Sequence, residues 1–227
     1  MSEIVDKNLE RIIKLKLCTE EINNLEQIEE ICVQDINLME KKLNIDLKEI
    51  SKLKNLKRLS LKFFDITDEV VDVLNNLEYL EEIEFDICNF KTEKNMSDKI
   101  LYLSVYNCTE FKNKIINNCK NLLELEIVHS GLININELRE FSNLKFLRLS
   151  DCNVISLEKI NLFKELEELY LNNIELYTDL EISGMDKLIY ISLNGSKTQN
   201  REEYKNKILA QKNNIELEFE ENNLKEE

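Results

Sequence analysis

The chain has 227 residues, of which 43% are hydrophobic and 33% charged, so it can bury the core of a folded domain. Its 45 acidic and 30 basic residues give a formal net charge of −15, which disfavours nucleic-acid phosphates and anionic membranes as partners. Only three glycines and no proline occur, which excludes a glycine-rich phosphate-binding loop.

No stretch approaches the ~18 uninterrupted apolar residues of a membrane-spanning helix. The first residues, Met1 to Asp6, show neither the basic nor the apolar segment of an export signal, so we expect a cytoplasmic protein. The six cysteines have no CxxC spacing and are expected to be free thiols in a reducing compartment. The abundance of lysine, asparagine, isoleucine and glutamate favours an AT-rich bacterial genome.

The N-terminal segment, residues 1–27, is predicted to be a cap or a degenerate repeat. One side of a helix would bury Ile4, Leu9, Ile12 and Ile13. Alternatively, Leu15 and Leu17 fit a weak first strand. The end of this cap is not fixed by the pattern.

Residues 28–197 are predicted to be a series of internal repeats. One unit reads Leu144-x-x-Leu147-x-Leu149-x-x-Cys152-x-Val154, and a weaker unit begins at Ile28 and continues through Ile36 and Leu38. The anchor position recurs every 22 residues at Leu103, Leu125, Leu147, Leu169 and Ile191. Upstream, Leu59 to Ile83 is 24 residues and Ile83 to Leu103 is 20, so the two irregularities cancel.

Each unit combines two periods. The LxL segment alternates like a short strand, whereas the apolar residues that follow recur every three positions, as in a 3₁₀ helix. The unit after Leu149 shows this second period at Val154, Leu157, Ile160, Phe163 and Leu166. Such a unit buries its apolar edge only when copies stack on one another.

These units resemble leucine-rich repeats of the 22-residue class typified by bacterial internalins. The resemblance implies an α/β solenoid: a curved horseshoe with a concave parallel β-sheet, short 3₁₀, helical or irregular returns on the convex side, and terminal caps. Family members usually carry asparagine at the ninth position, but here that column reads Phe64, Cys88, Cys108, Ser130, Cys152, Ile174 and Ser196. We predict that the three cysteines of this column are buried turn thiols.

Residues 198–219 are predicted to be a C-terminal cap. Arg201 to Gln211 fits a helix with Tyr204, Ile208 and Leu209 on one side. Residues 215–219 then alternate as a last strand would, and residues 220–227 form a polar tail that we expect to fray. No internal linker is visible, so residues 1–227 are predicted to be one domain.

Strand alternation predicts which side chains point out of the concave face, where partners of this family commonly bind. The aromatic residues predicted on this face are Tyr102, Tyr106, Phe146, Tyr170 and Tyr190. The charged residues predicted there are Glu82, Glu84, Asp86, Glu124, Glu126, Arg148 and Glu168. Aromatic residues supply binding hot spots, and the acidic excess would steer a basic partner to this surface.

Catalytic interpretations of the sequence are weaker. His129 is the single histidine, which excludes a two-histidine metal site within one chain. A dyad with Cys108, a glycosidase pair of Glu124 and Glu126, and a calcium site around Glu84 are the remaining candidates, but an open sheet offers no water-excluding pocket. We therefore expect no catalytic residue, no metal and no cofactor.

The sequence thus predicts a monomeric, non-enzymatic scaffold that binds a protein or peptide, with a basic one favoured, through an acidic and aromatic concave face. It predicts neither a nucleic-acid nor a membrane partner. Two alternatives remain open: a regulatory subunit that docks on a catalytic partner, and a surface or host-directed protein like the internalins. The face itself could be unused, with binding at an edge or on the convex side.

Overall fold

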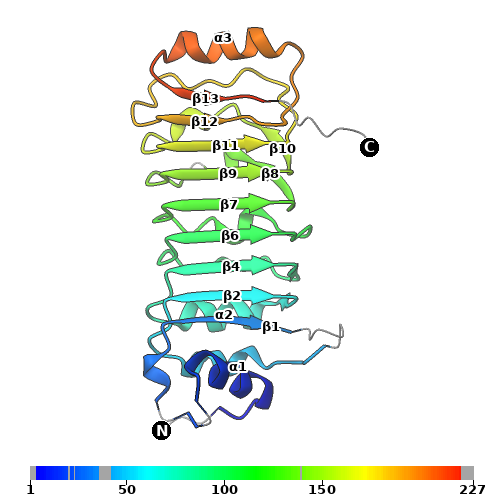
Figure 1. Ribbon diagram of the computed structural model, residues 1–227, viewed down its shortest axis with the longest axis vertical. Helices are drawn as coiled ribbons and strands as arrows, with labels where there is room; N and C mark the ends of the chain where they lie inside the picture. The colour runs from blue at the N-terminus through cyan, green and yellow to red at the C-terminus, as the bar shows by residue number, and fades with distance from the viewer. Residues whose placement is uncertain (1–3, 20, 23, 36–41, 139, 221–227) are drawn as a thin grey trace.

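The computed structural model describes residues 4–19, 21–22, 24–35, 42–138 and 140–220. Nine parallel strands stack in chain order into one long sheet (Figure 1). They are β1 (Glu30–Gln34), β2 (Arg58–Lys62), β4 (Glu82–Asp86), β6 (Tyr102–Tyr106), β7 (Glu124–Val128), β9 (Phe146–Ser150), β11 (Glu168–Asn172), β12 (Tyr190–Ser192) and β13 (Glu216–Glu218). The predicted solenoid of stacked strand-and-return units is confirmed.

The register of the sheet follows the anchor positions of the repeat. Leu59 pairs with Ile83, Ile83 with Leu103 and Leu103 with Leu125, so the 24- and 20-residue units do not shift the alignment. Within a strand, alternate residues point into the core, and both leucines of the LxL segment in β9 are fully buried. These layers of aliphatic side chains form one continuous core along the solenoid.

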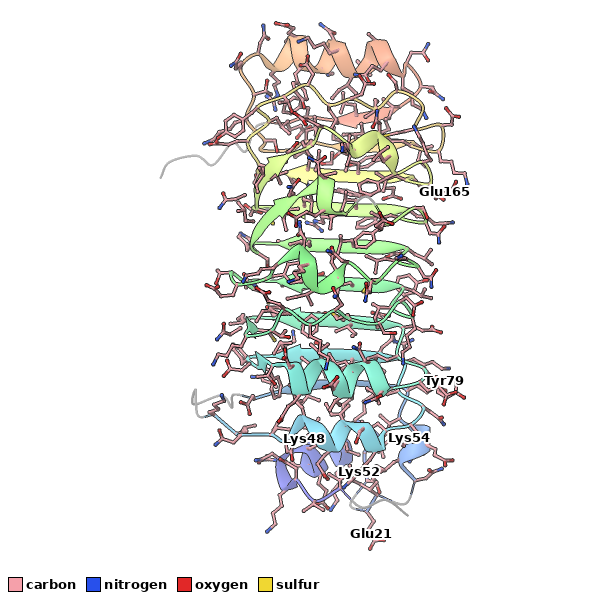
Figure 2. All side chains as sticks on the ribbon, turned by 180° about the vertical axis from the view of Figure 1, so that it is seen from behind. Glu21, Lys48, Lys52, Lys54, Tyr79 and Glu165 are labelled. Atoms are coloured by element: carbon pink, nitrogen blue, oxygen red, sulfur yellow. The ribbon has the colours of Figure 1, made fainter. Side chains whose placement is uncertain are left out.

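The returns lie behind the sheet, where Figure 2 shows them facing the viewer. They contain α2 (Asp68–Asn76) and the 3₁₀ turns η2 (Leu47–Lys52), η3 (Asn113–Ile116), η4 (Ile135–Glu137) and η5 (Ile160–Leu162). The 24-residue unit accommodates α2, whose Val71 and Leu74 are buried against the core. The 20-residue unit that follows returns from β5 (Asn89–Phe90) without a helix, which explains its shorter length.

Two small parallel sheets line the rim beyond the ends of the main strands: β3 (Asp65–Ile66) with β5, and β8 (Leu132–Asn134) with β10 (Asn153–Ser156). Leu132 lies 22 residues before Val154 but pairs with Asn153 instead, so the rim is displaced by one residue from the repeat spacing. Leu132 is 59% exposed, whereas Ile133 is buried. Gly131, at φ +54°, displaces the chain by one residue, and a Cβ at this position would lie 2.6 Å from the carbonyl oxygen of Phe111.

Cysteine and serine replace the family's asparagine in the turns. The Cys108 amide donates to Ser130 Oγ at 2.9 Å, and the Ser130 hydroxyl donates to the Val128 carbonyl at 2.7 Å. The Cys152 thiol likewise donates to the Ser150 carbonyl at 3.1 Å. The three cysteines of this column are buried, as predicted, and burial raises the pKa of Cys152. All six cysteines of the chain are free thiols in the structure.

The residue directly after β2, β4, β6, β7, β9 and β11 adopts a left-handed backbone conformation. Asn107, Asp151 and Asn173 are residue types that tolerate it, but Ile87 (φ 51°) is a β-branched residue that rarely does. The amide of this residue donates to the neighbouring strand's last carbonyl, for Ile87 to Tyr106 at 2.9 Å. This repeated hydrogen bond holds the strained turn in place.

The N-terminal cap is the helix α1 (Lys7–Leu17), followed by η1 (Leu25–Gln27). Asp6 caps α1 by accepting from the amides of Asn8 and Leu9 at 2.9 Å. The alternative of a strand through Leu15 and Leu17 is wrong, because both residues lie in α1 and Leu15 is 69% exposed. In the first repeat, Ile36 and Leu38 lie outside the described residues.

After β12 the chain forms a helix and one more strand. The helix α3 runs from Arg201 to Gln211 and covers the last layer of the core with Tyr204 and Ile208. Tyr204 donates its hydroxyl to the Thr178 carbonyl at 3.0 Å, and β13 then extends the sheet by one strand. The predicted tail lies outside the described residues beyond Glu220. No helix in the described part of the chain is long and apolar enough to cross a membrane.

Candidate functional site

The sheet face is the solvent-facing side of the nine-stranded sheet and corresponds to the predicted concave surface. The predicted columns of this face are in register: Glu82 pairs with Tyr102, and Phe146 with Glu168. All of the predicted site residues lie on the main strands and point to this face. The structure divides them into an ionic network, a central bridge and an aromatic stack.

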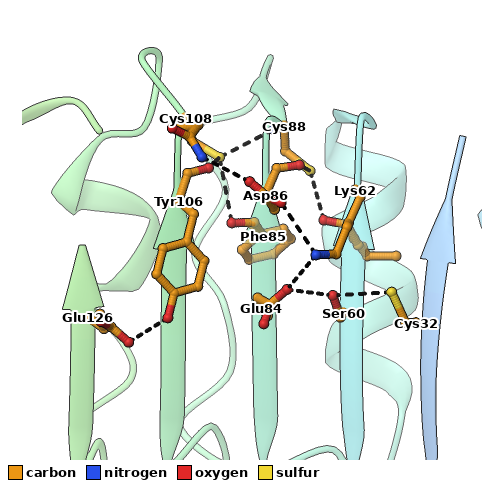
Figure 3. Close-up of polar contacts among 12 residues, drawn as sticks. Cys32, Ser60, Lys62, Glu84, Phe85, Asp86, Cys88, Tyr106, Cys108 and Glu126 are labelled. Atoms are coloured by element: carbon orange, nitrogen blue, oxygen red, sulfur yellow. Dashed lines mark hydrogen bonds and ion pairs between the residues drawn. The ribbon is translucent and has the colours of Figure 1, made fainter. Parts of the chain in front are cut away.

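The ionic network occupies the N-terminal strands (Figure 3). Lys62 Nζ lies 3.4 Å from a carboxylate oxygen of Glu84 and 3.4 Å from one of Asp86. Ser60 donates to Glu84 at 2.7 Å, and Cys32 Sγ lies 3.6 Å from Ser60 Oγ. Burial of Lys62 opposes its charge, but the two carboxylates outweigh this and raise the pKa of Lys62. The candidate calcium ligands Glu84 and Asp86 therefore already share the ammonium group of Lys62.

A bridge of three strands follows at the centre of the face. Tyr106 on β6 donates its hydroxyl to Glu126 on β7, and Arg148 Nη1 on β9 lies 2.9 Å from the other Glu126 oxygen. Two causes raise the pKa of Tyr106 to about 12: burial, which is the larger, and the hydrogen bond to Glu126. The phenol therefore keeps its proton and stays a hydrogen-bond donor. Both carboxylate oxygens of Glu126 are consequently engaged by neighbouring side chains.

Three aromatic rings stack across the next strands. Tyr170 on β11 lies between Phe146 on β9 and Tyr190 on β12, with ring centroids 5.1 Å apart in both pairs. The Tyr170 hydroxyl donates to Glu168 Oε2 at 2.8 Å. All three side chains are partly buried, because each ring covers part of its neighbour, and the remainder faces solvent. Contiguous, rigid aromatic surface of this kind suits a binding hot spot.

Glu82, Glu124 and Glu168 occupy the first outward position of β4, β7 and β11, here called the first column. Glu82 has Arg58 beside it in register, although the Arg58 guanidinium binds Glu30. Among the described residues, no lysine, arginine or histidine forms an ion pair with Glu82, Glu124 or Glu168. Burial, followed by repulsion from Glu82 and Glu168, raises the pKa of Glu124. A pocket of about 310 Å³ opens beside it, lined by both carboxylates of β7 and by Tyr102 and Phe146.

The cap strand β13 adds two carboxylates that the sequence reasoning did not place on this face. Glu216 pairs in register with Tyr190, and Glu218 with Ser192. Burial, followed by the contact with Glu218, raises the pKa of Tyr190 to about 12. The alternation of residues 215–219 was the available signal, since a strand that continues the sheet also continues its columns.

A rim groove of about 1180 Å³ was also not predicted. It lies beside β10 and includes the exposed side chains of Leu132, Ile155 and Tyr177. Its charged lining residues include acidic Asp151 and Glu175 as well as basic Lys197, so the groove favours neither sign of partner charge. The register displacement at Gly131 exposes Leu132, and the 22-residue spacing gives no indication of it.

The catalytic alternatives find no support in the geometry. His129 is 60% exposed at the rim and faces Asp151, with Nε2 3.7 Å from a carboxylate oxygen. The Cys108 thiol is buried and donates to the Tyr106 carbonyl at 3.1 Å. Within the described ranges, no group of three or more histidine, cysteine, aspartate or glutamate residues has the geometry to hold a metal ion.

Comparison with solved structures decides the fold class. Internalin C2 from Listeria monocytogenes superimposes with a TM-score of 0.69 and 20% identity, over 94% of this chain and 93% of that one. The chain has the leucine-rich-repeat fold. A leucine-rich-repeat protein from Leptospira interrogans superimposes with a TM-score of 0.57 and 18% identity, over 87% of this chain and 48% of that longer chain. No protein-family model and no curated protein matches the sequence.

The stacked strands of the leucine-rich-repeat fold present a broad and continuous surface. In this chain that surface combines an ionic network, a bridge and an aromatic stack on one sheet. Fold alone does not fix function, so the partner must be argued from these side chains.

Proposed function

We propose that this leucine-rich-repeat protein is a non-enzymatic scaffold that binds a protein or peptide, with a basic one favoured, on its sheet face. The observation that carries the proposal is the aromatic stack of Phe146, Tyr170 and Tyr190. It places three partly exposed rings beside carboxylates that form no ion pair among the described residues.

The physical chemistry supports a partner in this place rather than an unused face. Exposed apolar surface on a soluble protein is unfavourable, and three adjoining rings form more of it than scattered residues do. Uncompensated carboxylates beside the rings attract cationic groups, and a cation over an aromatic face gains further attraction. A basic segment would therefore satisfy both features at once.

Selection from a random-peptide library displayed on phage tests the proposal and requires no candidate partner. The enriched clones are measured against a sheet-face variant, Phe146→Ala/Tyr170→Ala/Tyr190→Ala, and against a control variant, Tyr79→Ala/Tyr177→Ala. The control removes tyrosines that are 49% and 77% exposed and lie off the sheet face. We expect clones to bind the wild type and the control, and to lose about tenfold or more in affinity for the sheet-face variant.

Two results would contradict the proposal: clones that bind the sheet-face variant as tightly as the control, or no enrichment over an uncoated surface. Thermal melts of both variants confirm that each is folded under the binding conditions. The two alternatives, a regulatory subunit and a surface or host-directed protein, stay predictions, as do the monomeric state and the cytoplasmic location.

A further inference from the structure

The first column of the sheet face alternates between acid and aromatic residues across seven consecutive strands. The carboxylates are Glu82 on β4, Glu124 on β7, Glu168 on β11 and Glu216 on β13. Between them lie the rings of Tyr102 on β6, Phe146 on β9 and Tyr190 on β12. Every carboxylate is thus two strands from the next, and every gap holds one ring.

The strand spacing sets the period of this column. Neighbouring strands lie ~4.8 Å apart, so successive carboxylates recur every ~9.6 Å along the solenoid axis. From Glu82 to Glu216 the column covers six strand spacings, or about 29 Å. A ligand that follows the column must present cationic groups with the same period on one of its sides.

A polyproline II segment has that period. It rises ~3.1 Å per residue with three residues per turn, so every third side chain lies on one side at intervals of ~9.3 Å. Over three intervals, the difference between the two periods adds up to a mismatch of about 1 Å between side chains and carboxylates. An α-helix repeats a side after seven residues, at ~10.5 Å, and departs by about 3 Å over the same length. A β-strand turns its third residue to the opposite side.

The side chains between the carboxylates fit the same ligand. Polyproline II segments dock in grooves lined by aromatic residues, where the rings pack against the residues between the charged positions. The pocket of about 310 Å³ between Tyr102 and Phe146 contains Glu124, so a cation entering it meets a carboxylate and two rings. The raised pKa of Glu124 is consistent with a carboxylate that has no cation in its surroundings.

We propose that the acid–aromatic column binds a segment in polyproline II conformation with a lysine or arginine at every third residue, lying along the solenoid axis. The inference rests on the proposed function and specifies the chemistry of the partner. Charge complementarity selects a cationic ligand, and the ~9.6 Å period selects its conformation.

Fluorescence anisotropy with labelled peptides tests this inference. The in-phase peptide repeats Pro-Pro-Lys over about twelve residues, so its first and last lysines lie ~28 Å apart. A block peptide of the same composition gathers all four lysines at one end. A third peptide is an alanine-rich helix with lysines seven residues apart. We expect the in-phase peptide to bind about tenfold or more tightly than either.

Two variants of equal charge separate specific contacts from long-range attraction. Glu82→Gln/Glu124→Gln/Glu168→Gln removes three carboxylates of the column, whereas Glu69→Gln/Glu137→Gln/Glu158→Gln removes three exposed carboxylates from the returns and rim. The column variant is expected to lose about tenfold or more in affinity for the in-phase peptide, and the control variant about threefold or less. The loss should shrink as salt is added.

Equal binding of the in-phase and block peptides would overturn the inference, because only charge would then matter. Tighter binding of the helical peptide, or no binding of any peptide, would also overturn it. None of these results changes the outcome of the phage selection. Clones of any sequence whose binding depends on the aromatic stack would still support the proposed function. The two failures are therefore distinguishable.

Discussion

The two halves of the sheet face have the same backbone arrangement but differ in how their charged side chains are balanced. On β2 and β4, Lys62 balances two carboxylates, and the polar groups satisfy one another. On β9, β11 and β12, three rings stack beside carboxylates that form no ion pair among the described residues. The strand positions are equivalent, since the register is continuous from β1 to β13. Side chains at equivalent positions, rather than the fold, therefore decide which half is open to a partner.

The largest expected effect on stability follows deletion of the C-terminal segment that contains α3 and β13, which lies next to the aromatic stack. Deleting residues 201–227 removes α3 and β13 and exposes the last core layer around Leu188 and Ile191. Loss of the buried Tyr204 and Ile208 alone forfeits about 2 to 3 kcal/mol for each side chain. We expect aggregation and a lower melting temperature, measured by light scattering and thermal denaturation.

Deleting only residues 221–227 is the matched control and should leave the melting temperature unchanged. A soluble 201–227 deletion with the stability of the wild type would contradict the assignment of this segment as a cap. It would also mean that β12 needs no neighbour on its outer edge.

The next effect tests the aromatic half directly. Tyr170→Ala removes the ring that contacts both Phe146 and Tyr190. Two aromatic contacts at ~0.5 to 1.5 kcal/mol each predict a loss of about 1 to 3 kcal/mol in the free energy of unfolding, measured in urea. Tyr177→Ala is the control, because that side chain is 77% exposed. Equal losses for both variants would show that the stack contributes nothing to stability.

A smaller effect tests the ionic half. Lys62→Met leaves Glu84 and Asp86 without their shared cation and should lower the free energy of unfolding by about 1 kcal/mol at pH 7. Because the folded-state pKa of Lys62 is raised, the advantage of the wild type persists below the ordinary value of 10.5 and disappears as the pH rises through the folded value. Chemical denaturation from pH 7 to pH 11 measures it.

Lys91→Met offers a matched control, since that lysine pairs with the single, more exposed carboxylate of Asp65 at 2.8 Å. We expect a change of less than about 0.5 kcal/mol there. A Lys62→Met variant no less stable than Lys91→Met would remove the distinction between a balanced and an unbalanced half.

The smallest expected effect is a gain in stability rather than a loss, and it concerns Glu124. Burial and nearby carboxylates raise the folded-state pKa of Glu124 above 4.5, so its ionised form destabilises the fold at neutral pH. Glu124→Gln should therefore raise the melting temperature at pH 7. The difference should vanish near pH 4, where the wild-type carboxyl is protonated. Glu137→Gln, on a return, should change neither value, and a destabilised Glu124→Gln variant would contradict the account.

The repeat spacing predicted the strands and their register, because a solenoid repeats one local rule and the two irregular units compensate. Which residue tolerates the left-handed turn was harder to predict. Asn107, Asp151 and Asn173 signal it, but Phe63 and Ile87 do not. There the hydrogen bonds to the next strand override the local preference of the residue.

The candidate site was predictable to the level of columns and not beyond. Strand alternation placed Tyr170 on the sheet face, but the stacking of its ring on Phe146 and Tyr190 depends on side-chain packing across strands. The sharing of Lys62 by two carboxylates depends on the same diagonal contacts. The exposure of Leu132 depends on one glycine turn, which a repeat template treats as any other position.

Hydroxyl-radical footprinting of the wild-type protein, with and without a peptide selected by phage display, tests the central claim most directly. Mass spectrometry reads the oxidation of each side chain, and the account predicts protection of Phe146, Tyr170 and Tyr190. It predicts unchanged oxidation of Cys32 at the ionic end and of Tyr79 off the sheet face. Protection of Tyr79, Leu132 or Tyr177 with an unprotected aromatic stack would contradict the account.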